Sequence, residues 1–180
     1  MTEAKGSDYD IRSILDEMRE EYWQGLAGVE EAGGDHLECV TFSLGGEVYG
    51  FETICAAEII RIPKLVKVPR VPEIIVGVFN LRGQITAAID FRPFLGLPQP
   101  PLSVAGRIIV VRSEKFAMGV LTEAVYGVET LPLSGFEPVV RSLSRVQREY
   151  VRGQLHHGER LIMLLDIVKL LASPELVINQ

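Results

Sequence analysis

The sequence predicts a mainly β fold in which two small β-barrels pack against each other, preceded by an acidic segment with an amphipathic helix. Three observations support this fold. Short runs of β-forming residues separated by turn residues begin at Leu37, a hairpin pattern occurs twice, and the negative charge is concentrated before residue 37. The length of 180 residues fits one domain with an extension, or two small subdomains that share a core.

The acidic segment comprises residues 1–36. Ten acids and three bases give it a net charge of −7, whereas the whole chain carries −6. Residues 7–27 have the period of an amphipathic helix, with one apolar stripe formed by Ile11, Ile14, Leu15, Met18, Tyr22 and Leu26. Two interpretations stay open: the apolar stripe packs on the protein's own domain, or it docks on another protein. In both, the acidic face is expected to point outward.

Two predicted hairpins follow the same plan. In the first, residues 40–44 and 48–51 flank the turn Gly45-Gly46-Glu47, where glycine permits the positive φ of a tight turn. In the second, residues 107–112 and 116–121 flank a turn at 113–115. The repetition predicts two β-rich halves, each closing into a small barrel because its strands are too short to be stable alone.

Each half also contains a strand that ends at an aspartate. Residues 83–85 (Gly-Gln-Ile) lead into an apolar run that ends at Asp90, and residues 153–155 (Gly-Gln-Leu) lead into one that ends at Asp166. We predict that both aspartates cap helices, with a catalytic carboxylate pair as the alternative. The proline-rich residues 98–101 are predicted to be a stiff linker between the halves.

Charge and motifs argue against several function classes. Residues 37–180 carry fourteen acids and fifteen bases without the basic patch that nucleic-acid binding needs. The sequence contains no phosphate-binding loop, dinucleotide-binding glycine motif, nucleophile elbow or zinc-protease motif. His156 and His157 are expected to lie in a turn rather than to bind a metal. We therefore expect no catalytic residue, cofactor, metal or nucleic-acid partner.

The sequence features that report on cellular location predict a cytoplasmic protein. No apolar run approaches the roughly 20 residues that span a bilayer, so we expect no direct membrane insertion, and no targeting signal is recognisable. Cys39 and Cys55 lie in apolar, strand-like runs without C-x-x-C spacing. They are predicted to be reduced and buried in the core.

One stretch, residues 69–83, contains polar residues that core packing does not explain. A strongly apolar run at 74–79 is followed by Asn80 and Arg82. Gly77 would let a backbone or a partner approach closely, and Asn80 suits a cap or a left-handed conformation. Arg82 presents a planar donor fork that needs carboxylates or carbonyls when it is partly buried. The alternative for Arg82 is a solvated charge in a turn.

The ordered motifs of residues 37–172 resemble the CheW family, the scaffold proteins of bacterial chemosensory arrays. The most specific match is Gly77-Val78-x-Asn80-Leu81-Arg82-Gly83. Further matches are Phe42-x-Leu44, Tyr49-Gly50, Glu58-Ile59-Ile60, Val68-Pro69-x-x-Pro72, Ile89-Asp90-x-Arg92, Gly119-Val120, Tyr150-Val151-x-Gly153 and Leu164-Leu165-Asp166. The resemblance implies two SH3-like five-stranded barrel subdomains over residues 37–172, with residues 1–36 as an extension and residues 173–180 as a C-terminal tail.

The resemblance also implies a function. Family members are non-enzymatic adaptors that couple methyl-accepting chemotaxis receptors to the histidine kinase CheA at membrane-associated arrays. Receptor contact is implied for the region between the barrels, at Ala56, Glu58, Ile59, Gly77, Asn80 and Arg82. Contact with the CheW-like regulatory domain of CheA is implied for exposed apolar barrel ends, at Ile62, Leu65 and Val66.

One contact and two alternatives complete these expectations. Because the family places a lone arginine and a lone acid together, we predict that Arg82 pairs with Glu58. The first alternative function is a scaffold in a chemosensory pathway that controls pili, gliding or a second messenger instead of flagella. The second is an enzyme built on small β-barrels, which a strongly shifted acid in a pocket near Glu58 or Glu123 would indicate.

Overall fold

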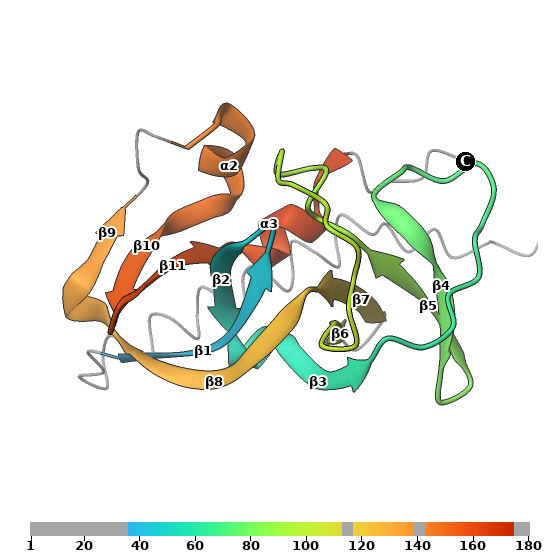
Figure 1. The fold of residues 1–180 in the computed structure, drawn as a ribbon, viewed down its shortest axis with the longest axis horizontal. Helices are drawn as coiled ribbons and strands as arrows, with labels where there is room; N and C mark the ends of the chain where they lie inside the picture. Colours follow the sequence, from blue (N-terminus) through green and yellow to red (C-terminus); the bar gives the residue numbers. More distant parts are fainter. Residues whose placement is uncertain (1–35, 113–116, 139–142, 175–180) are drawn as a thin grey trace, which may run out of the picture.

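The computed structural model describes residues 36–112, 117–138 and 143–174, so the helix predicted at 7–27 lies outside the described residues. The fold is mainly β, as predicted (Figure 1). The strands are β1 (His36–Leu44), β2 (Glu47–Glu52), β3 (Ala56–Arg61), β4 (Ile75–Leu81), β5 (Gln84–Ile89), β6 (Arg107–Arg112), β7 (Ala117–Thr122), β8 (Ala124–Pro132), β9 (Phe136–Pro138), β10 (Val151–His157) and β11 (Arg160–Leu165). The helices are the 3-10 turns η1 (Thr53–Cys55) and η2 (Leu133–Gly135), and the short α2 (Arg145–Tyr150) and α3 (Ile167–Leu171).

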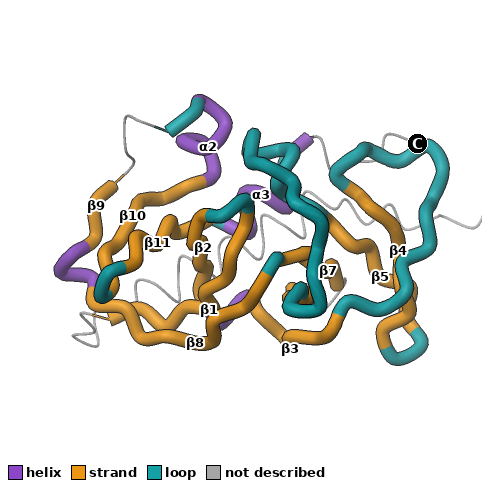
Figure 2. Tube along the Cα trace, in the orientation of Figure 1, coloured by secondary structure: helices purple, strands orange, loops and turns teal. Residues whose placement is uncertain are grey.

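The strands form two sheets, which lie side by side in Figure 1. One sheet has six strands in the order β8-β1-β2-β11-β10-β9, and the other has five in the order β3-β6-β7-β5-β4. Both predicted hairpins are present, because β1 pairs antiparallel with β2 and β6 pairs antiparallel with β7. Figure 2 shows that the long loops belong to the five-stranded sheet, where they connect β3 to β4 and β5 to β6.

The repeat had predicted two halves that follow each other along the chain, but the structure shows that they are interleaved. The first hairpin, β1–β2, belongs to the same sheet as β8 to β11, and the five-stranded sheet is built from residues 56–122. The proline-rich residues 98–101 therefore connect β5 to β6 within one sheet instead of linking two barrels. Local turn patterns identify a hairpin, but they do not specify which distant strand pairs with it.

The two sheets nevertheless repeat one topology. In each, the second strand of a hairpin pairs in parallel with a strand from elsewhere in the chain: β7 pairs with the earlier β5, and β2 pairs with the later β11. The register shifts at Gly77 of β4 and at Gly153 of β10, and both β5 and β11 lead to an aspartate, Asp90 and Asp166. Gly153 is therefore the counterpart of Gly77, whereas the sequence repeat had aligned it with Gly83.

Successive side chains of a strand point alternately into the core of their own sheet and into a central core between the two sheets. Along β6, Ile108 and Val110 belong to the core of the five-stranded sheet, whereas Ile109 and Val111 belong to a central cluster. The central cluster draws buried residues from both sheets, among them Phe42, Phe51, Ile89, Val120 and Leu165. The two sheets thus share one core. Cys39 and Cys55 are free and buried, as predicted.

Only one of the two predicted helix caps is present. The Asp166 side chain accepts a hydrogen bond from the Lys169 amide at 3.0 Å and caps α3. Asp90 is followed by turns, not by a helix. Its carboxylate accepts the Arg92 amide at 3.0 Å and binds the Arg92 guanidinium at 2.9 Å. A buried ion pair has taken the place of the predicted cap.

Candidate functional site

The six residues predicted to contact a receptor all come from the five-stranded sheet: they lie in β3, in β4 and in the turn after β4. They therefore do not line both sides of a groove between the two sheets. β3 and β4 are the outer strands of their sheet, and the segment after β3 brings these edges together. Val66 donates to the Val78 carbonyl at 2.9 Å and accepts from the Val78 amide at 2.8 Å, so the sheet curls into a closed ring.

An ion pair joins β3 to the β4–β5 turn, as predicted. Arg82 Nη2 donates to Glu58 Oε2 at 2.8 Å. The Arg82 side chain is 74% exposed and that of Glu58 is 20% exposed, so the pair contributes only about 0–1 kcal/mol to stability. Most of the guanidinium group therefore stays available to a partner.

A second arginine, which the sequence analysis missed, also faces Glu58. Arg112 Nη2 lies 3.7 Å from Glu58 Oε1, and its side chain is exposed. Arg112 ends β6, and β6 pairs with β3, so this contact depends on a strand pairing that the sequence does not reveal. The surface around Glu58 is therefore a carboxylate between two exposed arginines.

The β4–β5 turn holds Arg82 in place. Asn80 Oδ1 accepts a hydrogen bond from the Gly83 amide at 2.7 Å. Arg82 itself has the left-handed φ of 50°, followed by Gly83 at 88°. Asn80 therefore acts as the cap of the turn, and the left-handed conformation falls on Arg82 instead of on Asn80. This strained turn orients the guanidinium toward β3.

Gly77 permits a close approach of the chain to itself. A Cβ at this position would lie 2.8 Å from the carbonyl oxygen of Val66. The close neighbour is thus the segment that closes the ring, so Gly77 positions Val66 and supports the surface from within.

The three residues predicted to contact a kinase differ in exposure. Val66 is 58% exposed. Ile62 and Leu65 are half-buried and pack against the core of the five-stranded sheet. An exposed apolar contact is therefore available at Val66, whereas Ile62 and Leu65 mainly fill the end of the ring beneath it.

A buried polar network, also missed from sequence, connects the two sheets. The Arg92 guanidinium binds Asp90 at 2.9 Å, Glu123 at 3.2 Å and the Pro100 carbonyl at 2.8 Å. Glu123 in turn accepts the Ser43 hydroxyl and an amide of the β1–β2 turn, both at 3.0 Å. The network thus ties the six-stranded sheet to the segment that follows β5.

The environment of Glu123 keeps its carboxylate ionised. Burial raises its pKa, but the hydrogen bonds from Ser43, from the turn amides and from Arg92 outweigh this effect and hold the pKa below its ordinary value. The hydrogen bond to Asp90 raises the pKa of Arg92. A carboxylate held ionised in this way stabilises the structure and is a poor proton donor. Glu123 is therefore not the kind of shifted acid that would have indicated an enzyme.

Other kinds of site can be checked within the described residues. Over residues 36–112, 117–138 and 143–174, no three His, Cys, Asp or Glu side chains are grouped so that they could hold a metal ion. His156 and His157 are the last two residues of β10, so the prediction that they lie in a turn was wrong; the turn begins at Gly158. None of the described helices is long and apolar enough to cross a membrane.

Comparison with known proteins establishes the family. The family model for the CheW-like domain matches residues 38–175, which is more than half of the chain. The chain belongs to the CheW family. Chemotaxis protein CheW of Klebsiella aerogenes is 30% identical over 156 residues, which cover 86% of this chain and 94% of the relative.

Other relatives of this CheW-family protein carry different names. Protein PilI of Pseudomonas aeruginosa is 25% identical over 120 residues, covering 67% of each chain, and protein FrzA of Myxococcus xanthus is 26% identical over 138 residues, covering 76% of this chain and 86% of FrzA. A crystal structure of the scaffolding protein TtCheW from Thermoanaerobacter tengcongensis superimposes with a TM-score of 0.65 at 28% identity, covering 72% of this chain and 88% of that one. The CheW fold and a scaffold family are therefore shown.

Proposed function

We propose that this CheW-family protein is a non-enzymatic adaptor that couples methyl-accepting chemotaxis receptors to the histidine kinase CheA. The observation that carries the proposal is the surface around Glu58 and Arg82. A left-handed turn, an Asn80 cap and an ion pair present an arginine that is 74% exposed and contributes little to folding. Several features thus hold in place an exposed arginine that adds little to stability, and such an arrangement is expected where a partner binds.

The proposed mechanism is mechanical. The receptor residues Glu58 and Ile59 and the kinase residue Val66 lie on one continuous segment, which runs from β3 to the bridge with β4. Arg82 lies in the turn after β4 and is joined to this segment by its ion pair with Glu58. Both partners would therefore be held at a fixed spacing by one hydrogen-bonded ring. A small displacement of the receptor is then transmitted to the kinase without chemistry in the adaptor. We place the protein in the cytoplasm, at membrane-associated receptor arrays.

The receptor contact is tested by reversing the charge of Arg82. Arg82→Glu places a second carboxylate beside Glu58 and should weaken binding of a receptor-tip fragment at least tenfold, while binding of the CheA regulatory domain is unchanged. Arg160→Glu is the matched control, because Arg160 pairs with Glu129 on the other sheet. Titration calorimetry with each partner gives both affinities. Full receptor-dependent kinase control by Arg82→Glu in a reconstituted array would contradict the proposal.

The kinase contact is tested at Val66. Val66→Asp should lower affinity for the CheA regulatory domain at least tenfold, because it places a charge in the apolar centre of the contact. Val128→Asp is the control, since Val128 is also 58% exposed but lies on the six-stranded sheet. Equal losses for both variants would show that Val66 has no special role.

A second candidate is a scaffold in a pathway that controls pili, gliding or a second messenger. The similarity to PilI and FrzA as well as to CheW supports keeping it. Deleting the gene in its host distinguishes the two, because loss of swimming bias alone supports the flagellar pathway. Loss of surface motility or of a second-messenger response with intact swimming supports the alternative.

A further inference from the structure

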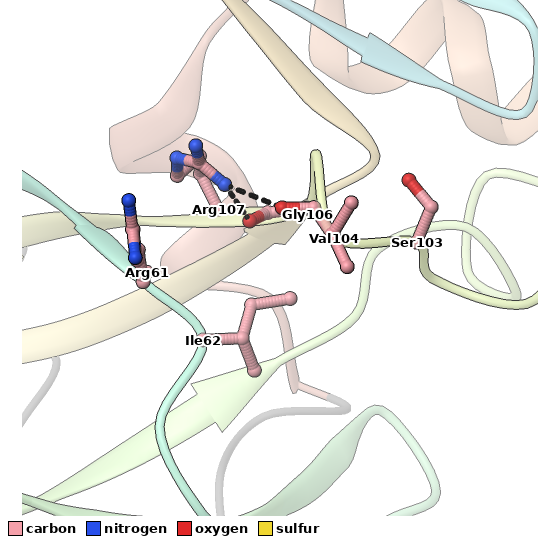
Figure 3. Close-up of a pocket in the computed structure, with 6 residues that line it drawn as sticks. All are labelled: Arg61, Ile62, Ser103, Val104, Gly106 and Arg107. Carbon is pink, nitrogen blue, oxygen red and sulfur yellow. Dashed lines mark hydrogen bonds between the residues drawn. The ribbon is translucent and has the colours of Figure 1, made fainter.

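A cavity of about 450 Å³ opens at the end of β3 and the start of β6. It is lined by Arg61, Ile62, Ser103, Val104, Gly106 and Arg107 (Figure 3). Arg61 and Arg107 are direct cross-strand partners, and Figure 3 shows both guanidinium groups at the same side of the cavity. Arg107 Nη1 donates to the carbonyls of Val104 at 2.9 Å and Gly106 at 2.7 Å, which fixes its position.

Within the part of the chain that the structure describes, the arginine pair is not neutralised by an acid. No acid among the described residues forms an ion pair with Arg61 or Arg107. Like charges directly opposite each other destabilise a strand pair, and an anion between them relieves this repulsion. Two guanidinium groups above an apolar wall, formed by Ile62 and the 99% exposed Val104, fit a ligand that combines carboxylates with apolar side chains.

The basic character continues along the segment after β3. Residues 59–72 contain no acid, and their bases are all exposed: Arg61, Lys64, Lys67 and Arg70. Val66 and Val68 lie exposed between them, at 58% and 37%. We call this surface, together with Arg107 and Val104, the basic end of the five-stranded sheet. It is an apolar strip with a basic border.

We propose that the basic end binds the acidic segment of this same chain, residues 1–35. This segment carries a net charge of −7, and its predicted helix at 7–27 has an apolar stripe bordered by acids. The stripe at Ile11, Ile14, Leu15 and Met18 covers Val66 and Val104. The acids that border the stripe contact the arginine pair and therefore face the sheet. The sequence interpretation had expected them to face the solvent.

The chain is long enough to reach this surface. The acidic segment joins the described domain at His36, the first residue of β1. Residues 28–35 span up to roughly 28 Å when extended, and a 21-residue helix adds roughly 32 Å. A domain of this size has a radius of gyration of about 14 Å, so the segment can reach any face.

Docking would have one consequence that rests on the proposed function. Because Val66 belongs to both the basic end and the proposed kinase surface, the segment and the CheA regulatory domain would compete for it. A surface that is free one-tenth of the time binds its partner tenfold more weakly. The acidic segment would thereby set the affinity for the kinase.

Paramagnetic NMR on the full chain tests the docking itself. A nitroxide is attached at Ser13→Cys. The native Cys39 and Cys55 do not react, because burial raises the pKa of each thiol to about 12. We expect the amide signals of Arg61, Val66 and Arg107 to lose at least half their intensity. The intensity should return in high salt, which screens the charges.

Two sets of variants give the expected and the opposing outcomes. Arg61→Glu with Arg107→Glu should abolish the signal loss, whereas Arg145→Glu with Arg148→Glu, an equal charge change on exposed residues of α2, should not. Replacing Asp8, Asp10, Asp16, Glu17, Glu20 and Glu21 by their amides leaves the described domain untouched and should also abolish it. Signal loss confined to the six-stranded sheet, absent everywhere, or insensitive to these variants would overturn the proposal.

Two further measurements distinguish docking within one chain from docking between chains, and test the effect of docking on kinase binding. Mixing nitroxide-labelled chains with unlabelled isotope-enriched chains should give no signal loss, and a loss there would overturn docking within one chain. Affinity for the CheA regulatory domain should rise about tenfold in the amide variant. No binding of CheA by any variant contradicts the proposed function alone, because the NMR result does not involve a kinase.

Discussion

The Arg92 guanidinium is a buried cation held by two carboxylates, and this arrangement separates the roles of two aspartates that look alike in sequence. Asp166 only caps a five-residue helix, whereas Asp90 neutralises Arg92 with both its oxygens. Removing one partner of a buried ion pair leaves an uncompensated charge, which costs far more than losing a helix cap.

We therefore predict different costs for the two aspartates. Asp90→Ala should lower the free energy of unfolding by about 3–5 kcal/mol, and Asp166→Ala by about 1 kcal/mol. Urea denaturation of both variants measures the difference. Similar losses at the two positions would mean that Glu123 and the Pro100 carbonyl compensate Arg92 without Asp90.

Glu123 should make stability depend on pH. Its folded pKa is lower than the ordinary value of 4.5, so its contribution is complete above about pH 4.5 and is lost as the pH falls through the folded pKa. Glu123→Gln should cost about 1–3 kcal/mol at pH 7, and the difference from the natural protein should shrink toward pH 3. The exposed Glu159→Gln is the control. A difference that does not vary with pH would contradict this role.

At the scale of single elements, two equivalent glycines sit where one strand must pass close to its neighbour. A Cβ at Gly77 would lie 2.8 Å from the Val66 carbonyl, and one at Gly153 would lie 2.4 Å from the Glu137 carbonyl. Both neighbours are backbone atoms, which cannot move aside as a flexible side chain does. Each glycine therefore allows an edge of its sheet to be paired.

Alanine at either glycine should separate these edges. Gly77→Ala and Gly153→Ala should each lower the free energy of unfolding by about 1–3 kcal/mol, and Gly77→Ala should also weaken the proposed kinase contact because Val66 moves. Gly135→Ala, where nothing lies within 4 Å of the added carbon, should change stability by less than about 0.5 kcal/mol. Thermal unfolding compares the three, and equal stability of all three would contradict the clash.

Elements that depend on local sequence could be predicted, and those that depend on register could not. The glycine turn and alternating residues of β1–β2 identify a hairpin without reference to the rest of the chain. The Glu58–Arg82 pair was predicted only through the family resemblance. Arg112 beside Glu58, and Arg61 beside Arg107, follow from the β3–β6 register, which a period of two residues does not specify.

At the scale of the whole molecule, the error in the predicted order of the halves has a physical reason. Alternation shows which side of a strand is buried, but β1 can satisfy its pattern against any sheet with an apolar face. The shared central cluster then makes the two sheets one unit. The repeat was visible in sequence, and its interleaving was not.

This interleaving predicts how fragments behave. A fragment of residues 1–100 contains β1 and β2 without β8 and β11, and β3 to β5 without β6 and β7, so it should unfold without a cooperative transition. A fragment of residues 53–123 contains every strand of the five-stranded sheet and should retain more strand signal in circular dichroism. Cooperative unfolding of the first fragment would show that the halves fold independently in chain order.

The position of β1 and β2 at the start of the chain also matters while the protein is being made. The ribosome releases this hairpin first, yet its parallel partner β11 ends only at residue 165. At 5–20 residues per second, the outer edge of β2 waits roughly 6–23 s for that partner. The five-stranded sheet is complete by residue 122 and can form meanwhile, so the first strands to be synthesised are among the last to be paired.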